Sequence, residues 1–165
     1  MVTSVFETAV APWLRLETQT LVKNLLISHE RAFSEPLLSR NQITHSKRTA
    51  AQELFASPIA VLAHDGSSDP LLTYANGTAL RLWGRSWTSM VGMPSRFTAE
   101  ESERRERAST LKQVRQGEGF RGYSGIRINR EGRRFMISNA RIWSLWGDID
   151  EIPGQAAAFS SWWWI

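Results

Sequence analysis

The sequence predicts an α+β domain in which a helical first third is followed by five short strands with short helices between them. Two observations carry this prediction. Apolar residues of the first third recur mostly at three- and four-residue spacings, which is the period of an amphipathic helix. From Pro58 onward, apolar residues gather in short runs bounded by glycine, proline, asparagine and aspartate, which is typical of strands and turns.

The N-terminal third, residues 1–56, is expected to form a helical extension. Pro12 suits the first turn of a helix better than its interior. A second helix is expected over 47–55, with Thr44 or Ser46 as its N-cap. The residues that set the period of the first helix are Val10, Trp13, Leu14, Leu21, Val22, Leu25, Leu26 and Phe33.

Two strands and two helices are expected in the middle of the chain. The apolar run 58–66 ends in turn residues and suits a buried strand, and 71–76 suits a second one. A short helix follows over 77–83. A charged helix is then expected to begin at a capping box formed by Thr98 and Glu101.

The last third is expected to contain three strands. Apolar residues alternate within 119–129, and the segment 129–132 offers a glycine for a hairpin turn. The segment 133–146 is long and rich in aromatic and β-branched residues. The segment 154–165 is expected to be the closing strand.

Several consecutive strings make the sequence similar to the MEKHLA domain family, which is related to PAS domains. The resemblance runs from about Leu21 to Phe159 and implies a PAS-like five-stranded antiparallel sheet with short helices on one face. It implies one domain over 1–165, with an N-terminal helical extension at 1–56 and a PAS-like core at 57–165. The strings are LLISHERAF, AAQELFASPIAVLAHDG, DPLLTYANGTALRLWGRSW, MPSRFTAEESERRERASTL, GYSGIRINREGRRFMISNARIW and GQAAAF.

The resemblance also implies that the sheet and its short helices enclose a small pocket. A small-molecule site is usually apolar with a few fixed polar groups. A plain packed core would use many of the same aromatic residues, so both interpretations stay open. The residues expected to line the pocket are Tyr74, Asn76, Leu80, Trp83, Met90, Arg96, Phe97, Tyr123, Ile126, Ile128, Phe135, Ile137, Asn139, Trp143, Gln155 and Phe159.

Eight tryptophans suggest an interface. A strand that continues through the consecutive tryptophans 162–164 sends them to both faces of a sheet, and the face outside the core needs a cover. The N-terminal helix, from the same chain or from a partner, is the expected cover. We therefore expect a homodimer with Trp13, Leu14, Trp162 and Trp164 in or near its interface.

The sequence has no cysteine, which excludes disulfides, thiolate metal sites and flavin photochemistry by cysteine adduct. Other flavin binding stays open because Asn139 and Gln155 fall on consecutive predicted strands, loosely like the amides that hold a flavin ring in related domains. The alternative is that both amides bond the backbone. The cofactor is therefore unknown at this stage.

Haem, metal and catalytic sites find no support in the sequence. The histidines, His29, His45 and His64, are scattered, and none falls after Pro94, where the PAS resemblance places a haem ligand. No nucleophile motif or phosphate loop is present, so we expect no catalytic residue, no metal and no enzyme.

A cytoplasmic location is the default expectation for a sequence without cysteine or a signal-peptide pattern, and we expect binding to neither nucleic acid nor membrane. The net charge is +4, but basic and acidic residues are interleaved as on a solvated helix face. No apolar stretch is long enough to span a bilayer, and the N-terminus has no signal-peptide pattern. The arginines could hold a carboxylate or phosphate on one face, or pair with glutamates; we expect pairing. The arginines considered are Arg96, Arg127, Arg133, Arg134 and Arg141.

Three functional hypotheses follow from the resemblance and the residues together. The first is a sensory or signalling module that binds a small ligand, contacts a signalling partner protein, or both. The second is a ligand carrier or small-molecule enzyme that uses the same pocket, which a buried ionisable group would favour. The third is a structural dimerisation domain whose core fills the pocket.

Overall fold

A computed structural model describes residues 10–38, 46–114, 118–147 and 152–165. The helical elements are η1 (Pro12–Leu14), α1 (Leu16–Phe33), α3 (Lys47–Ala56), α4 (Gly77–Trp83), α5 (Trp87–Met90), η2 (Ser95–Thr98) and α6 (Glu101–Gln113). The strands are β1 (Ala60–His64), β2 (Leu72–Ala75), β3 (Gly119–Ile128), β4 (Arg134–Ser144), β5 (Gln155–Phe159) and β6 (Ser161–Trp164).

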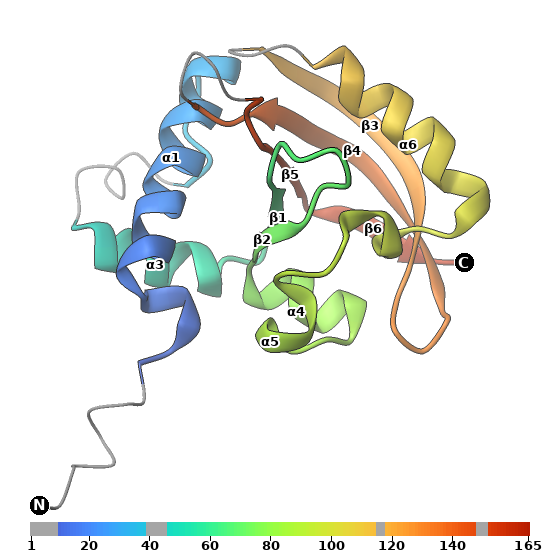
Figure 1. Ribbon diagram of the computed structural model, residues 1–165, viewed down its shortest axis with the longest axis horizontal. Helices are drawn as coiled ribbons and strands as arrows, with labels where there is room; N and C mark the ends of the chain where they lie inside the picture. Colours follow the sequence, from blue (N-terminus) through green and yellow to red (C-terminus); the bar gives the residue numbers. More distant parts are fainter. Residues whose placement is uncertain (1–9, 39–45, 115–117, 148–151) are drawn as a thin grey trace, which may run out of the picture.

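The strands form one antiparallel sheet in the order β2-β1-β5-β4-β3, with β6 also paired to β4. β5 and β6 follow one another along the same edge of β4, separated by Ser160 alone. They act as one strand broken at a single residue. The predicted α+β fold with a five-stranded antiparallel sheet is therefore confirmed (Figure 1).

The sheet separates two apolar cores, because side chains alternate between its faces along each strand. Val61 and Ala158 belong to the core under α1 and α3, whereas Ala60 and Phe159 belong to the core that includes α4 and Met90 of α5. In Figure 1, α1 and α3 lie on the opposite side of the sheet from α6. The N-terminal helix α1 therefore covers one face of the sheet over β1, β4 and β5, but it does not cover β6 as expected, because Trp163 is 52% exposed.

The regular pairing of β3, of β4 and of the β5–β6 strand is broken at the same position along the sheet. β3 changes register on either side of Tyr123, next to Gly122, whose φ is 79°. In β4, Asn139 has a φ of 55°, a left-handed conformation that is uncommon outside glycine but tolerated by asparagine. Ser160 separates β5 from β6 opposite this point. These irregularities are β-bulges that bend the strands together.

The bulges shift which residues face the core. In β4, the odd-numbered Ile137 faces the α4 core before the bulge, and the even-numbered Ala140 faces it after the bulge. Across the break at Ser160 the same shift occurs, since Phe159 and then Trp162 pack in that core. A strict two-residue alternation along these strands would assign half of each strand to the wrong face.

Local capping follows the sequence at one helix and departs from it at another. Ser46 is the N-cap of α3, and its hydroxyl accepts a hydrogen bond from the Thr49 backbone N–H, as predicted. The capping box of Thr98 and Glu101 is wrong. Thr98 is buried at the end of η2, where its hydroxyl donates to the Ser95 carbonyl at 2.7 Å, and α6 begins after Glu100 with no side-chain cap.

Candidate functional site

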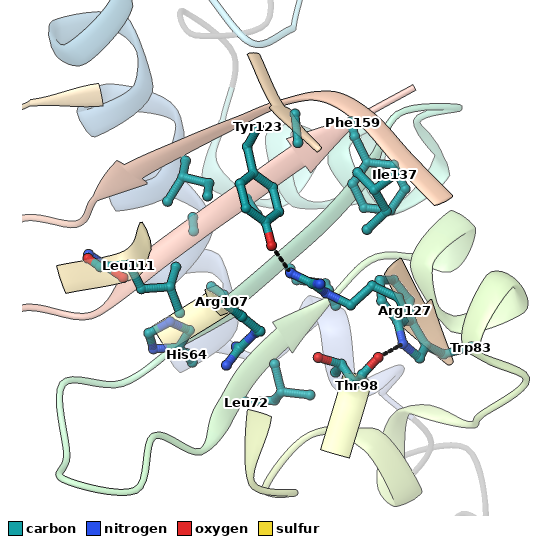
Figure 2. Close-up of a pocket in the computed structure, with 17 residues that line it drawn as sticks. His64, Leu72, Trp83, Thr98, Arg107, Leu111, Tyr123, Arg127, Ile137 and Phe159 are labelled. Atoms are coloured by element: carbon teal, nitrogen blue, oxygen red, sulfur yellow. Dashed lines mark hydrogen bonds between the residues drawn. The ribbon is translucent and has the colours of Figure 1, made fainter. Parts of the chain in front are cut away.

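A cavity of about 50 Å³ lies between the sheet, α4, η2 and α6 (Figure 2). Apolar side chains form most of its wall, and polar side chains from the sheet and from α6 also reach it. The apolar residues include Leu62, Leu72, Trp83, Leu111, Ile137, Ile142 and Phe159, and the polar ones are His64, Thr98, Arg107, Tyr123, Arg127 and Gln155.

Arg127 and Tyr123 both reach the cavity from β3. The Arg127 guanidinium lies back over Gly125, where Nη2 donates to the Tyr123 hydroxyl at 2.8 Å and Nη1 donates to the Ile126 carbonyl at 2.8 Å. A Cβ on residue 125 would stand 2.6 Å from the Tyr123 oxygen, so glycine leaves the room that this pair occupies. Arg127 is 7% exposed.

Arg107 comes from α6, on the other side of the cavity. Its Nη2 donates to the Ser95 hydroxyl at 3.0 Å. Burial, and then the charge of Arg127, lower the pKa of the Arg107 guanidinium to about 10. At neutral pH the Arg107 guanidinium therefore remains a cation, and it faces the same small space as Arg127.

His64 ends β1 beside the same cavity. Its Nδ1 lies 2.8 Å from the Asp65 carbonyl, which only accepts, so Nδ1 carries the proton. Nε2 is then an acceptor, and it is enclosed without a hydrogen-bond partner among the described residues. Burial lowers the pKa of His64, which keeps the imidazole neutral.

Two further hydrogen bonds hold the helices over the cavity. Gln155 Nε2 donates to the Leu111 carbonyl at 2.7 Å, which fastens β5 to the last turn of α6. Trp83 Nε1 donates to the Thr98 carbonyl at 3.2 Å and fastens α4 to η2. Both side chains therefore line the cavity and also hold α4, η2 and α6 in place around it.

The structure places the sequence-predicted pocket residues in several locations. Trp83, Tyr123, Ile137, Gln155 and Phe159 line the cavity. Leu80, Met90 and Phe135 lie in the same apolar core without reaching it. The remaining eight are Tyr74, Asn76, Arg96, Phe97, Ile126, Ile128, Asn139 and Trp143.

Each of these eight residues has contacts that account for its position outside the cavity. Asn76 caps α4, and its amide bonds Val61, Leu54 and Ile59. Tyr74 and Trp143 pack in the core under α1. Arg96 pairs with Asp69 and stacks beside the exposed Phe97, and Ile126 and Ile128 alternate with the cavity-facing residues of β3. Asn139 is exposed at its bulge.

The four residues expected at an interface fall into two places. Trp13 stacks on Phe55 with ring centroids 3.7 Å apart, and Leu14 packs against the core under α1. Trp162 and Trp164 pack on Phe135 in the other core. All four are partly buried within their own chain, whereas Trp163 on the opposite face of β6 is 52% exposed.

The two amides do not form a flavin cradle. Gln155 bonds the backbone of α6, and Asn139 lies on the other side of the sheet, where it borders an open depression with Glu35 and Arg141. A space of about 50 Å³ is also far smaller than a flavin or a haem. Within the described ranges, no group of three or more histidine, aspartate or glutamate residues could hold a metal ion.

Sequence reasoning assigned neither Arg107 nor Arg127 to the cavity. A signal for Arg127 was present, since Tyr123, Gly125 and Arg127 share one phase of a strand and the small central residue leaves room for a long side chain. Arg107 carried no such signal, because it is one of several arginines in an evenly charged helix.

Comparisons with known proteins agree with this fold. A PAS domain from Colwellia psychrerythraea has a TM-score of 0.57 at 14% identity, covering 67% of this chain and 92% of that one. A LOV protein of Rhodobacter sphaeroides has a TM-score of 0.55 at 15% identity, covering 74% and 67%. No curated protein sequence matches the chain. No helix of the described segments is long and apolar enough to cross a membrane.

A family model described as the MEKHLA domain matches residues 19–164, which is nearly the whole chain. The match includes the strands and helices that surround the cavity. This chain therefore belongs to the MEKHLA domain family and has a PAS-like fold.

Proposed function

We propose that this chain is a sensory module that binds a small ligand in the cavity under α6. The observation that carries the proposal is a mostly apolar cavity that also presents polar groups, among them His64 Nε2, which has no hydrogen-bond partner among the described residues. A ligand there would contact α6 and the sheet at once. Its binding would favour the arrangement in which α6 is closed on the sheet.

The test compares the wild type with Ala157→Val, which adds two methyl groups to the cavity wall. Native mass spectrometry of the wild type as purified is expected to show a bound compound that Ala157→Val lacks. Ala108→Val, the same change on the exposed side of α6, is the control and is expected to keep the compound. A wild type without added mass, together with a more stable Ala157→Val, would instead favour a structural domain with an unused gap.

A ligand carrier or small-molecule enzyme is the second candidate, and the enclosed His64 favours it. A neutral imidazole whose Nε2 faces a cavity can accept a proton from a bound molecule. Incubation of the wild type and His64→Gln with the compound recovered from the protein would separate the candidates. A product formed by the wild type alone supports an enzyme, and an unchanged compound supports the sensor.

We also propose that the module forms a homodimer through its C-terminal strand. Trp163 and Ile165 are 52% and 57% exposed, and Trp162 and Trp164 lie beside them on β6. Light scattering is expected to show a dimer that Trp163→Ser weakens. Trp146→Ser removes an exposed tryptophan away from β6 and serves as the control. A monomer at every concentration would exclude the dimer.

A further inference from the structure

Four arginines outside the cavity have carboxylate partners in the described structure. Glu35 receives Arg121 at 3.0 Å and Arg141 at 2.7 Å. The other two ion pairs are Arg96 with Asp69 at 3.1 Å and Arg134 with Glu100 at 3.4 Å. All four arginines are more exposed than Arg127. Because water already stabilises an exposed charge, these cations depend less on a carboxylate partner than a buried one does.

Arg107 and Arg127 differ from these four. Neither forms an ion pair with any residue that the structure describes. Figure 2 shows both side chains reaching into the same cavity, with His64 beside Arg107. A histidine carries no negative charge in either protonation state, so His64 offsets neither cation. Arg127 is buried and Arg107 is partly buried, and two cations that share one small space are unfavourable unless an anion joins them.

Both guanidinium groups keep donors for such an anion. A guanidinium has five N–H donors. Arg127 uses two of them on Tyr123 and Ile126, and Arg107 uses one on Ser95. The Tyr123 hydroxyl and the narrow space over Gly125 fix the plane of the Arg127 group. A fixed, planar fork is suited to the two oxygens of a carboxylate.

We propose that the ligand of the cavity is a small organic carboxylate whose anionic end lies between Arg107 and Arg127. This inference rests on the proposed function, that the cavity takes a ligand. A volume of about 50 Å³ holds roughly three to five water-sized groups, which suits an acid of about two or three carbons. The apolar wall of Trp83, Ile137 and Phe159 would face the hydrocarbon end.

The wall favours a carboxylate over phosphate. Phosphate presents polar oxygens in every direction, and it would leave several of them against apolar side chains without donors. A carboxylate places its oxygens at one end and its methyl or methylene groups at the other. That polarity matches a cavity whose wall combines two guanidinium groups with apolar side chains.

Calorimetric titration of the full chain with propionate and with propionamide tests the charge directly, because the two probes have similar size and shape. Sodium chloride keeps the ionic strength constant. We expect propionate to bind and propionamide to bind at least about tenfold more weakly. Inorganic phosphate is expected to bind no better than propionamide.

Arg107→Met and Arg127→Met are expected to weaken propionate by at least about tenfold, whereas Arg134→Met, which removes the same charge from an exposed pair, leaves it within about twofold. Arg107→Met should also raise the melting temperature of the free protein, since it removes one of two facing cations. This second readout holds even where Arg127→Met fails to fold.

Outcomes that overturn the inference are distinct from those that overturn the sensor. Equal binding of propionamide, or tighter binding of phosphate, would leave the cavity a ligand site and exclude the carboxylate. If Arg107→Met and Arg127→Met both bind propionate as tightly as the wild type, the two arginines do not form the anion site. Failure of propionate to bind would overturn the carboxylate class; the compound carried by the purified wild type and lost in Ala157→Val would still decide the sensor.

Discussion

At Gly125 the chain passes beneath the hydrogen bond between Arg127 and Tyr123. We predict that Gly125→Ala lowers stability by about 1–3 kcal/mol, because a Cβ there stands 2.6 Å from the tyrosine oxygen and 3.1 Å from Arg127 Nη1. Urea unfolding measures the loss. Ser124→Ala, the exposed neighbour on the other face, is the control and should change stability little. A stable Gly125→Ala with unchanged propionate binding would show that the pair shifts freely.

His29 is a buried histidine on the face away from the cavity, and it makes the protein sensitive to acid. Its Nδ1 donates to the Glu35 carbonyl at 3.0 Å, and its Nε2 accepts from Arg141 at 3.2 Å, so the ring is neutral. Burial, and then the Arg141 charge, lower the pKa of His29 to about 4. Because the unfolded chain takes up a proton near pH 6.5, the stability from neutral His29 is complete above that value and is lost as pH falls towards 4.

When pH falls from about 7.5 to about 5, proton uptake by His29 in the unfolded chain is expected to lower the free energy of unfolding by about 2 kcal/mol. This value follows from a pKa of about 4 in the folded state and 6.5 in the unfolded one. Urea unfolding at both pH values measures it. His29→Gln cannot take up this proton, so its stability should fall less over the same interval. Equal falls in the two proteins would assign the acid sensitivity to other groups.

Sequence reasoning found the apolar part of the cavity better than the polar part. Trp83, Ile137 and Phe159 are large and apolar within strongly patterned segments, and such residues face a core. Arg107 is chemically indistinguishable from Arg104 and Arg105 in the sequence. Only the placement of α6 over the sheet separates them, since Arg104 bonds the backbone carbonyls of η2 while Arg107 turns into the cavity.

At the scale of the elements, the order of helices and strands was predictable, but the phase within the last strands was not. Turn residues marked each boundary, and the hairpin at 129–132 has its glycine at a φ of 84°, as expected. The alternation of apolar and polar residues along β4 did not indicate the bulge at Asn139. An asparagine within a strand is the one hint, because its side chain tolerates the left-handed conformation better than its neighbours do.

The bulge in β4 depends on the backbone of Asn139, whose φ is 55°. We predict that Asn139→Val lowers stability by about 1–2 kcal/mol, because a β-branched residue adopts this conformation poorly. Asn139→Gly is the matched variant and is expected to be neutral or slightly stabilising. Since Asn139 is exposed, burial contributes little to either change. If valine is as stable as glycine in urea unfolding, the strand has moved to a regular register.

At the scale of the whole molecule, the two cores share the strands between them. Val61 and Ala63 pack under α1, while Ala60 and Leu62 of the same strand face the other core. Asn24 adds hydrogen bonds in both directions to the backbone of Trp146, which fastens α1 to the end of β4. The described part of the N-terminal extension, residues 10–38 and 46–56, is therefore part of the packed structure, and we propose that it unfolds as one unit with the described residues of the PAS-like core.

Leu25, fully buried in the middle of α1, tests this proposal. Leu25→Ala is expected to cost about 2–5 kcal/mol, and the loss should shift the entire transition, because α1 and the cavity share one sheet. Tryptophan fluorescence and far-ultraviolet circular dichroism are expected to give coincident urea curves in the wild type and in the variant. Two separated transitions would mean that α1 detaches first and that the PAS-like core at 57–165 stands alone. A ligand acting in the cavity would then reach α1 only weakly, whereas coincident curves make α1 the natural element through which the sheet reports binding.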